Sequence, residues 1–173
     1  MEDNKKQFKS GNKGDRRGRS DKPFEEKEFD SVILDLARVT RVTKGGKRMR
    51  FRAAVVIGDR KGKVGFGIAK GADVALAVSK ATRLAKKTLF KIALSKTTIP
   101  HWVKLKEHAS QVLLKPAPAG SGIIAGGAMR VVLELGGVPD VVGKMLGGNN
   151  KVNNARATIK ALKSLKLRTA SKK

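Results

Sequence analysis

The clearest pattern in this chain is an alternation of apolar and polar positions that begins near residue 50. Arg50 and Arg52 fall on one face of the expected strand, and the opposite face is apolar, with Phe51, Ala53, Val55 and Ile57. A period of two is typical of a β-strand with one buried face. Segment 32–43, rich in Val, Ile, Leu and Thr, predicts a preceding strand, and the Lys-Gly-Gly-Lys sequence at 44–47 supplies the turn.

A third strand is expected over residues 63–69, after a turn at 58–62. One side of it is apolar, with Val64, Phe66 and Ile68. The other side carries Gly65 and Gly67 beside Lys63, so we expect a bare backbone face there that a ligand could approach closely.

Helical periodicity replaces the alternation over residues 73–90. Apolar residues recur at the spacing of a buried stripe, namely Val74, Ala77, Val78, Ala81, Ala85 and Leu89. A second stripe on the same helix is basic and comprises Lys80, Arg83 and Lys87. Three strands and this helix predict a small α+β unit in which the helix covers the apolar face of the sheet.

A second unit follows a short connector at residues 93–97. We expect strands at 98–105, 111–115 and 138–146, a helix at 126–135, and a last helix that runs to about 165 with Asn153 or Asn154 as its cap. The helix at 126–135 is apolar nearly all round, which predicts a central position. The predicted fold class is therefore α+β in two small domains: a three-stranded sheet plus helix, then a sandwich-like α+β domain.

The chain divides into four parts on this basis. Residues 1–28 form a basic, glycine-rich arm that we expect to be flexible, because it holds too few apolar residues to bury. The first domain covers 29–92, the second covers 98–165, and a basic tail covers 166–173.

The net charge of the chain indicates what kind of partner it binds. The 173 residues include 39 Lys and Arg against 14 Asp and Glu, a net charge of +25 that is spread over most of the chain. Self-repulsion of this size penalises a free monomer, so we expect a nucleic acid as the counterion. The chain has no Cys, which excludes disulfides and cysteine-ligated zinc. Without an apolar leader or a long apolar run, neither export nor a membrane partner is expected.

Two glycine-rich segments match nucleotide-binding motifs only in part. Gly120–Ala125 fits the dinucleotide pattern with Asp140 twenty positions later, but Pro116 and Pro118 interrupt the required tight turn. Segment 58–64 lacks both the P-loop spacing and the Ser or Thr after its Lys. We therefore expect no cofactor, and we interpret 58–64 as a basic hairpin turn against an RNA backbone.

The remaining chemistry of the sequence is sparse. His101, His108 and Glu107 are too few for a metal site. Aromatic residues make up only 4% of the chain, which favours recognition of backbone and shape over base stacking, and Trp102 is expected to pack or to contact a partner. No catalytic residue is predicted, and the chain is not expected to be an enzyme.

Three longer segments resemble the family of the bacterial small-subunit ribosomal protein five. They read KGGKRMRFRAAVVIGDRKGKVGFG at 44–67, GIIAGGAMRVVLE at 122–134 and NARAT at 154–158. The similarity extends over about 24–165, while 102–110 and 151–154 depart from the usual family pattern.

The resemblance implies a first domain like the double-stranded-RNA-binding fold and residence in the small ribosomal subunit, in the cytoplasm, bound to its rRNA. It implies contacts with ribosomal proteins four and eight, a place near the channel through which mRNA enters, and an influence on decoding accuracy. Lys44, Gly45 and Gly46 match the family's hairpin loop, which approaches rRNA and is associated with spectinomycin sensitivity.

The predicted site residues follow from the charge pattern and the resemblance together. The RNA-binding set comprises Lys44, Gly45, Gly46, Lys47, Arg48, Arg50, Arg60, Lys61, Lys63, Lys80, Arg83 and Lys87. The resemblance implies a protein interface at Gly122, Gly126, Gly127 and Arg130. No metal and no homo-oligomer are expected.

Two alternatives stay open at this point. One is a free-standing double-stranded-RNA-binding protein or RNA chaperone with no fixed place in a particle. The other is a nucleotide-dependent enzyme, which rests only on the glycine-rich segments and on fold analogy.

Overall fold

Residues 29–167, which the computed structural model describes, form two four-stranded sheets and three helices. The predicted arm at 1–28 and most of the predicted basic tail lie outside the described residues. The α+β fold class in two small domains is confirmed.

The first sheet is antiparallel in the order β1-β2-β3-β4. Its strands are β1 (Asp30–Thr43), β2 (Gly46–Gly58), β3 (Lys63–Gly71) and the two-residue β4 (Phe90–Lys91), which the sequence analysis did not predict. Helix α1 (Val74–Lys87) lies between β3 and β4 in sequence. The side chain of Asp73 caps α1 by accepting the Val74 amide hydrogen at 2.7 Å.

The second sheet has the order β5-β6-β8-β7, with β7 and β8 parallel and the other pairs antiparallel. Its elements, in chain order, are β5 (Val103–Glu107), β6 (Ser110–Pro116), β7 (Ile123–Ile124), α2 (Gly127–Leu135), β8 (Val141–Met145) and α3 (Lys151–Lys163).

Three expected boundaries in this domain were wrong. The strand expected at 138–146 spans only Val141–Met145. The strand expected at 98–105 begins only at Val103, because Thr98 instead forms isolated bridges to Ser95 and Asp140. Asn150, rather than Asn153 or Asn154, caps α3, since its side-chain oxygen accepts the amide hydrogens of Val152 and Asn153.

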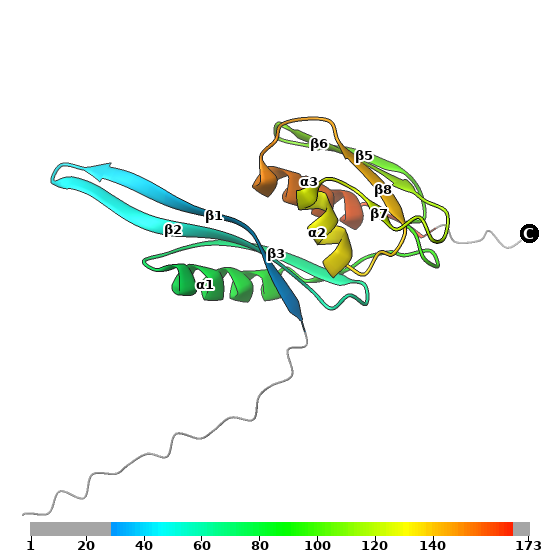
Figure 1. Cartoon of the computed structure of the whole chain (residues 1–173), viewed down its shortest axis with the longest axis horizontal. Coiled ribbons are helices and arrows are strands. Elements are labelled where there is room, and N and C mark those ends of the chain that lie inside the picture. The colour runs from blue at the N-terminus through cyan, green and yellow to red at the C-terminus, as the bar shows by residue number, and fades with distance from the viewer. Residues whose placement is uncertain (1–28, 168–173) are drawn as a thin grey trace, which may run out of the picture.

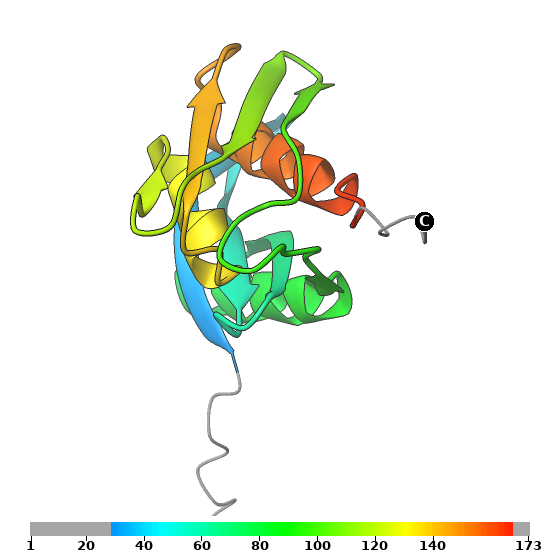
Figure 2. The ribbon, with the colours of Figure 1, turned by 90° about the vertical axis from the view of Figure 1, so that its right-hand side faces the viewer.

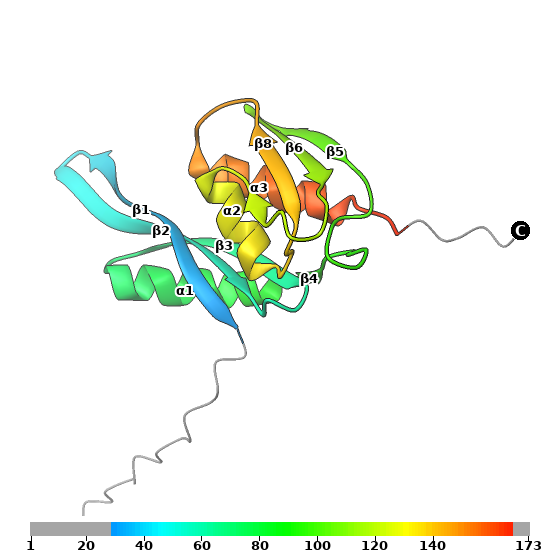
Figure 3. The same ribbon diagram turned by 45° about the vertical axis from the view of Figure 1, so that its right-hand side comes forward.

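The elements stack in four layers (Figures 1 and 2). Helix α1 forms one outer layer, the first sheet follows, α2 and α3 form the third layer, and the second sheet closes the stack. Figure 3 shows the same order from an intermediate direction. Both faces of the first sheet are therefore covered near the middle of the molecule, whereas the second sheet has helices on one face only.

Helix α1 packs on the first sheet through small residues. Ala77, Ala81 and Ala85 are fully buried against the face that carries Val55 and Ile57. Gly65 and Gly67 lie under this helix, and a Cβ at either would overlap a helix carbonyl. The expectation that this glycine face is open to a ligand was therefore wrong: α1 occupies it, because only glycine allows so close an approach.

The opposite face of the first sheet joins a core shared by both domains. Val56 and Val64 are fully buried in one cluster with Leu133, Met129 and Leu162 of the second domain. The alternation along β2 predicts only one covered face. Positions 54 and 56 of β2 continue the apolar pattern on the second face, which is the signature of a strand buried on both sides.

The β1–β2 hairpin extends well beyond this core. Strand β3 pairs with β2 only from Phe51 to Gly58, so Gly46–Arg50 pairs with β1 alone. Figure 1 shows this two-stranded ribbon projecting past the end of α1. A register shift between Ile33 and Asp35 marks a bulge in β1.

Candidate nucleic-acid interface

One face of the projecting hairpin is built from basic residues. On β2, positions 48, 50 and 52 are all Arg, and they share the face that carries Val56 nearer the core. The register places Arg41 of β1 directly opposite Arg48, with its side chain on the same face. This sheet face is thus apolar where the second domain covers it. Along the hairpin, where no part of the described chain covers it, the same face is basic.

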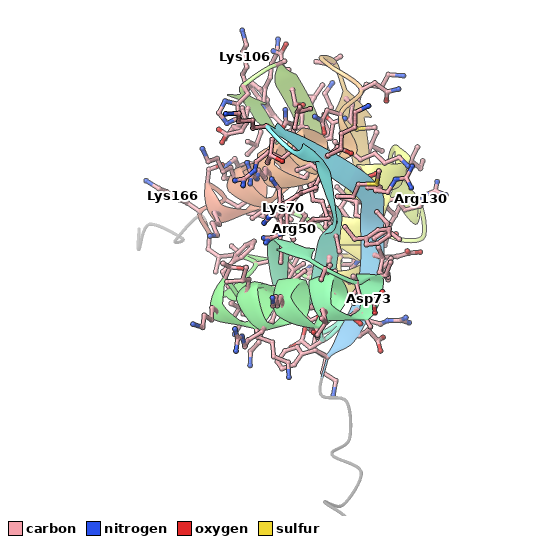
Figure 4. All side chains as sticks on the ribbon, turned by 90° about the vertical axis from the view of Figure 1, so that its left-hand side faces the viewer. Arg50, Lys70, Asp73, Lys106, Arg130 and Lys166 are labelled. Atoms are coloured by element: carbon pink, nitrogen blue, oxygen red, sulfur yellow. The ribbon has the colours of Figure 1, made fainter. Side chains whose placement is uncertain are left out.

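Lys70 of β3 completes this surface. It lies opposite Arg52, and it lines a hollow of about 240 Å³ together with Arg41, Arg48 and Arg50. Figure 4 shows Arg50 and Lys70 close together above α1. We refer to Arg41, Arg48, Arg50 and Lys70 as the basic hairpin surface. Within residues 29–167 none of the four forms an ion pair, whereas Arg52 binds Asp35 at 2.9 Å.

The tip of the hairpin is a two-residue turn at Lys44 and Gly45 between the paired residues Thr43 and Gly46. Gly46 has a φ of 136°, which L side chains rarely adopt, and the Thr43 hydroxyl donates to its carbonyl at 3.0 Å. Lys47 is exposed but lies on the face opposite to Arg48. The predicted pair Lys47 and Arg48 therefore does not present one continuous surface.

Arg60, Lys61 and Lys63 lie at the other end of β2. The strand has 13 residues, which separates this turn from the tip by about 40 Å. The predicted RNA-binding residues of the two turns therefore do not converge.

The turn at 58–63 is also a structural joint. The Arg60 amide donates to the carbonyl of Leu135 at the end of α2, at 3.0 Å. A Cβ at Gly58 would overlap this same carbonyl, and one at Gly137 would overlap the carbonyl of Arg60. Arg60 itself has a φ of 55°. The backbone of the predicted basic turn is thus occupied by the second domain, while the side chains of Arg60 and Lys61 stay exposed.

Asp59 organises this turn from within. Its Oδ1 accepts the amide hydrogens of Lys61 at 2.7 Å and of Lys63 at 2.9 Å. Burial raises the pKa of the Asp59 carboxyl, but the amide hydrogens of Lys63 and Lys61 outweigh burial and hold this pKa below its ordinary value.

The third predicted group, Lys80, Arg83 and Lys87, is exposed on α1. Helix α1 covers the sheet face opposite to the basic hairpin surface. The structure thus divides the predicted RNA-binding residues among the hairpin, the joint and the outer helix.

Arg41 and Lys70 were missed by the sequence analysis. A signal for Arg41 was present: a two-residue turn at 44–45 pairs Thr43 with Gly46, and counting back two positions places Arg41 opposite Arg48. Lys70 could be placed on this surface only from the β2–β3 register, and the longer turn at 58–63 does not fix that register by itself.

The residues of the implied protein interface do gather on one side of the second domain. Gly126 and Arg130 border a hollow of about 310 Å³ that Ile124 and Lys144 also line. Gly127 is exposed next to them, and Gly122, with a φ of 69°, directly precedes β7. The buried Asp140 accepts the Gly122 amide hydrogen at 2.9 Å, so this carboxylate anchors the loop and is not free to bind a ribose.

Two basic residues of α3 make contacts within the protein. Lys160 forms an ion pair with Glu107 of β5, and this hydrogen bond lowers the pKa of the Glu107 carboxyl. Lys163 lies over the ring of Phe90 at 4.9 Å and so connects α3 to β4 of the first domain.

In the described part of the chain, no three His, Cys, Asp or Glu side chains are grouped so that they could hold a metal ion. Within the same residues, no helix is both long and apolar enough to cross a membrane.

Both of the two domains that share this core match a known protein family. Residues 29–93 match the family described as "Ribosomal protein S5, N-terminal domain", and residues 105–172 match "Ribosomal protein S5, C-terminal domain". The chain is 48% identical over 143 residues to "Small ribosomal subunit protein uS5" of Campylobacter jejuni strains 81-176, 81116 and RM1221, an alignment that covers 83% of this chain and 97% of each relative.

The chain belongs to the ribosomal protein S5 family. It is a protein of the small ribosomal subunit, which lies in the cytoplasm in bacteria. This family consists of structural ribosomal proteins, so the expectation that the chain is not an enzyme is confirmed.

Proposed function

We propose that the chain binds small-subunit rRNA chiefly through the basic hairpin surface. The observation that carries this proposal is that four exposed cations, three on the projecting ribbon and Lys70 of β3 at its base, line one hollow with no ion-pair partner among residues 29–167. When these four cations bind RNA phosphates, counterions are released and the repulsion among the four cations is relieved. Lys44, Gly45 and Gly46 at the tip approach the same RNA backbone, whereas Lys47 lies on the opposite face of the ribbon.

The test is a charge reversal at Arg48 and Arg50. We expect the double variant Arg48→Glu/Arg50→Glu to bind an rRNA transcript at least about tenfold more weakly and to lower the slope of log K against log salt by about two. The matched control is Lys86→Glu/Lys96→Glu, which makes the same charge change at exposed lysines outside every predicted site. Equal affinity of the two variants would overturn the proposal.

The absence of cysteine allows the contact to be mapped. A Lys44→Cys variant that carries an iron chelate should cut rRNA near the hairpin tip, whereas Lys86→Cys should not. Cleavage of the same nucleotides from both positions would contradict a contact at the tip.

We infer that the chain supports translational accuracy near the channel through which mRNA enters. The family resemblance supports this role, together with contacts to ribosomal proteins four and eight. The surface of Gly122, Gly126, Gly127 and Arg130 is the proposed contact with protein four. An Arg130→Glu variant should change stop-codon readthrough in cells while its affinity for the rRNA transcript stays at the wild-type value; unchanged readthrough would remove this surface from the function.

A further inference from the structure

We propose that the second sheet carries a separate RNA-binding surface on the face that has no helices. This inference rests on the proposed function, because it assigns a second group of phosphate contacts to the same chain. The surface consists of Lys104, Lys106, Lys115 and Lys144, and we refer to it as the lysine sheet face.

Strand alternation defines this face. On the inner side, Val112 and Leu114 of β6 and Val141 of β8 are fully buried against α2 and α3. The outer positions are therefore the intervening residues. The register places Lys104 opposite Leu113 and Leu113 opposite Lys144, so one row across three strands reads Lys-Leu-Lys. Lys106 and Lys115 follow two positions along their strands.

The lysines are close enough to act together on one polyanion. Adjacent strands are about 4.8 Å apart and same-face neighbours in one strand are about 6.7 Å apart, so Lys104 and Lys144 start roughly 10 Å from each other. This spacing is comparable with the Debye length of about 8 Å at physiological salt, so their repulsion is only partly screened. All four side chains are exposed.

No carboxylate compensates these charges on the outer face of β5 to β8. Glu107 lies on the inner side, where it pairs with Lys160, and Asp140 is 4% exposed and bound to the Gly122 amide. No two of the four lysines are directly opposite each other in the register, so the sheet tolerates them, but their charges add up on one face. Such a face favours an anionic partner.

The composition of the face favours RNA phosphates over a protein. Protein interfaces are enriched in aromatic residues and Arg and depleted of Lys. The outer positions of these strands carry four Lys, with Gln111 and the aliphatic residues Leu113, Val142 and Ile124, and no aromatic residue. Such strands can bind a backbone, but they carry no ring on which a base could stack.

This surface is distinct from the basic hairpin surface. Figure 4 shows Lys106 at the far end of the layer stack from α1, well separated from Arg50 and Lys70. We infer that the two surfaces contact different segments of rRNA.

The experiment compares Lys104→Glu/Lys106→Glu with the hairpin variant and the Lys86→Glu/Lys96→Glu control in the full chain, with a small-subunit rRNA transcript as the probe. We expect the sheet variant to bind at least about tenfold more weakly and to lower the salt slope by about two, as each lost phosphate contact lowers the slope by about one. Lys104→Arg/Lys106→Arg keeps the charge and should keep the affinity.

Trp102 supplies an independent readout. It is the only Trp in a chain without Tyr, it directly precedes β5, and its exposed fraction is 63%. We expect RNA to change Trp102 fluorescence in the wild type and in the hairpin variant at saturation, and to change it less in the sheet variant.

The outcomes separate the two proposals. Weak binding by the hairpin variant with control-level binding by the sheet variant would overturn only the lysine sheet face, and control-level binding by both would overturn the proposed function. If the sheet variant keeps its rRNA affinity but loses a neighbouring protein from assembled subunits, the occupant is an acidic protein surface and the RNA assignment is wrong.

Discussion

Strand β2 carries a basic, glycine-containing turn at each end, and the two turns have different surroundings. At one end, Lys-Gly-Gly-Lys-Arg at 44–48 forms the free tip of the hairpin. At the other end, Gly-Asp-Arg-Lys-Gly-Lys at 58–63 packs against the end of α2. Similar local sequences therefore give a projection at one end and a joint between domains at the other.

The glycines of the two turns differ in how much free space surrounds them. A Cβ on Gly45 or Gly46 would meet nothing within 4 Å, whereas one on Gly58 would overlap the Leu135 carbonyl. At the tip, glycine is needed for backbone conformation; at the joint, it is needed for space. A basic glycine-containing turn thus indicates an exposed binding loop only when nothing else in the fold needs its backbone.

The largest expected effect is at the joint. Gly58→Ala places a methyl group against backbone atoms that cannot move independently, so we expect it to lower the free energy of unfolding by about 3 kcal/mol. Urea unfolding measures this change. Gly45→Ala is the matched control at the tip and should change the free energy of unfolding by less than about 0.5 kcal/mol. Equal midpoints for both variants would show that the domains are not tightly joined at this turn.

Much of the first domain could be predicted because its signals are local. The alternation at 50–57, the glycine-containing turns and the helical periodicity at 73–90 each depend on neighbours in sequence. Helix α1 is shorter than predicted and ends at Lys87, where Thr88 hydrogen bonds to the backbone of Phe66. That contact is 22 residues away in sequence, so periodicity alone could not place the end.

The site was predicted less completely, because it depends on register and on contacts between domains. The charges of Arg48 and Arg50 were evident, but their neighbours Arg41 and Lys70 come from other strands. The joint at 58–63 was interpreted as an RNA-binding turn because the end of α2, more than 70 residues later, gives no local signal. Basic residues reveal a polyanion partner, but only the fold shows which of them share a surface.

A smaller effect is expected for the tip glycine with positive φ. Gly46→Ala would force an L side chain to a φ of 136°, and we expect a loss of about 1–2 kcal/mol confined to the hairpin. Amide exchange in residues 41–50 should become faster, while exchange in α2 and β6 stays unchanged. Faster exchange throughout the chain would show that the tip is coupled to the shared core.

Replacing Asp59 tests how much its side-chain hydrogen bonds stabilise the turn at 58–63. Asp59→Ala removes the acceptor for the amides of Lys61 and Lys63 and should lower the free energy of unfolding by about 1 kcal/mol. Because the pKa of Asp59 is lower in the folded state, its charge stabilises the fold above the unfolded value of about 3.9.

The stabilising effect of the Asp59 charge is lost as the pH falls through the folded pKa. Asp59→Asn keeps an oxygen acceptor without the charge, so its difference from the wild type should be present at pH 6 and should vanish at strongly acidic pH. A difference that grows on acidification would contradict a lowered pKa.

The smallest effect is expected at the one ion pair that spans the joint turn and β1. The Nε of Arg60 lies 2.9 Å from Asp30 Oδ2, but the side chains are 71% and 53% exposed. Water and salt screen such a pair, so Asp30→Asn should change the free energy of unfolding by about 0.5 kcal/mol or less, and the change should disappear in 1 M salt. The joint is held instead by the backbone bond from Arg60 to Leu135 and by the fit at Gly58, neither of which depends on charge. Two results together would contradict this view: Asp30→Asn lowers the free energy of unfolding as much as Gly58→Ala does, and salt has the same effect on the wild type. Electrostatic attraction would then hold the domains together at this turn.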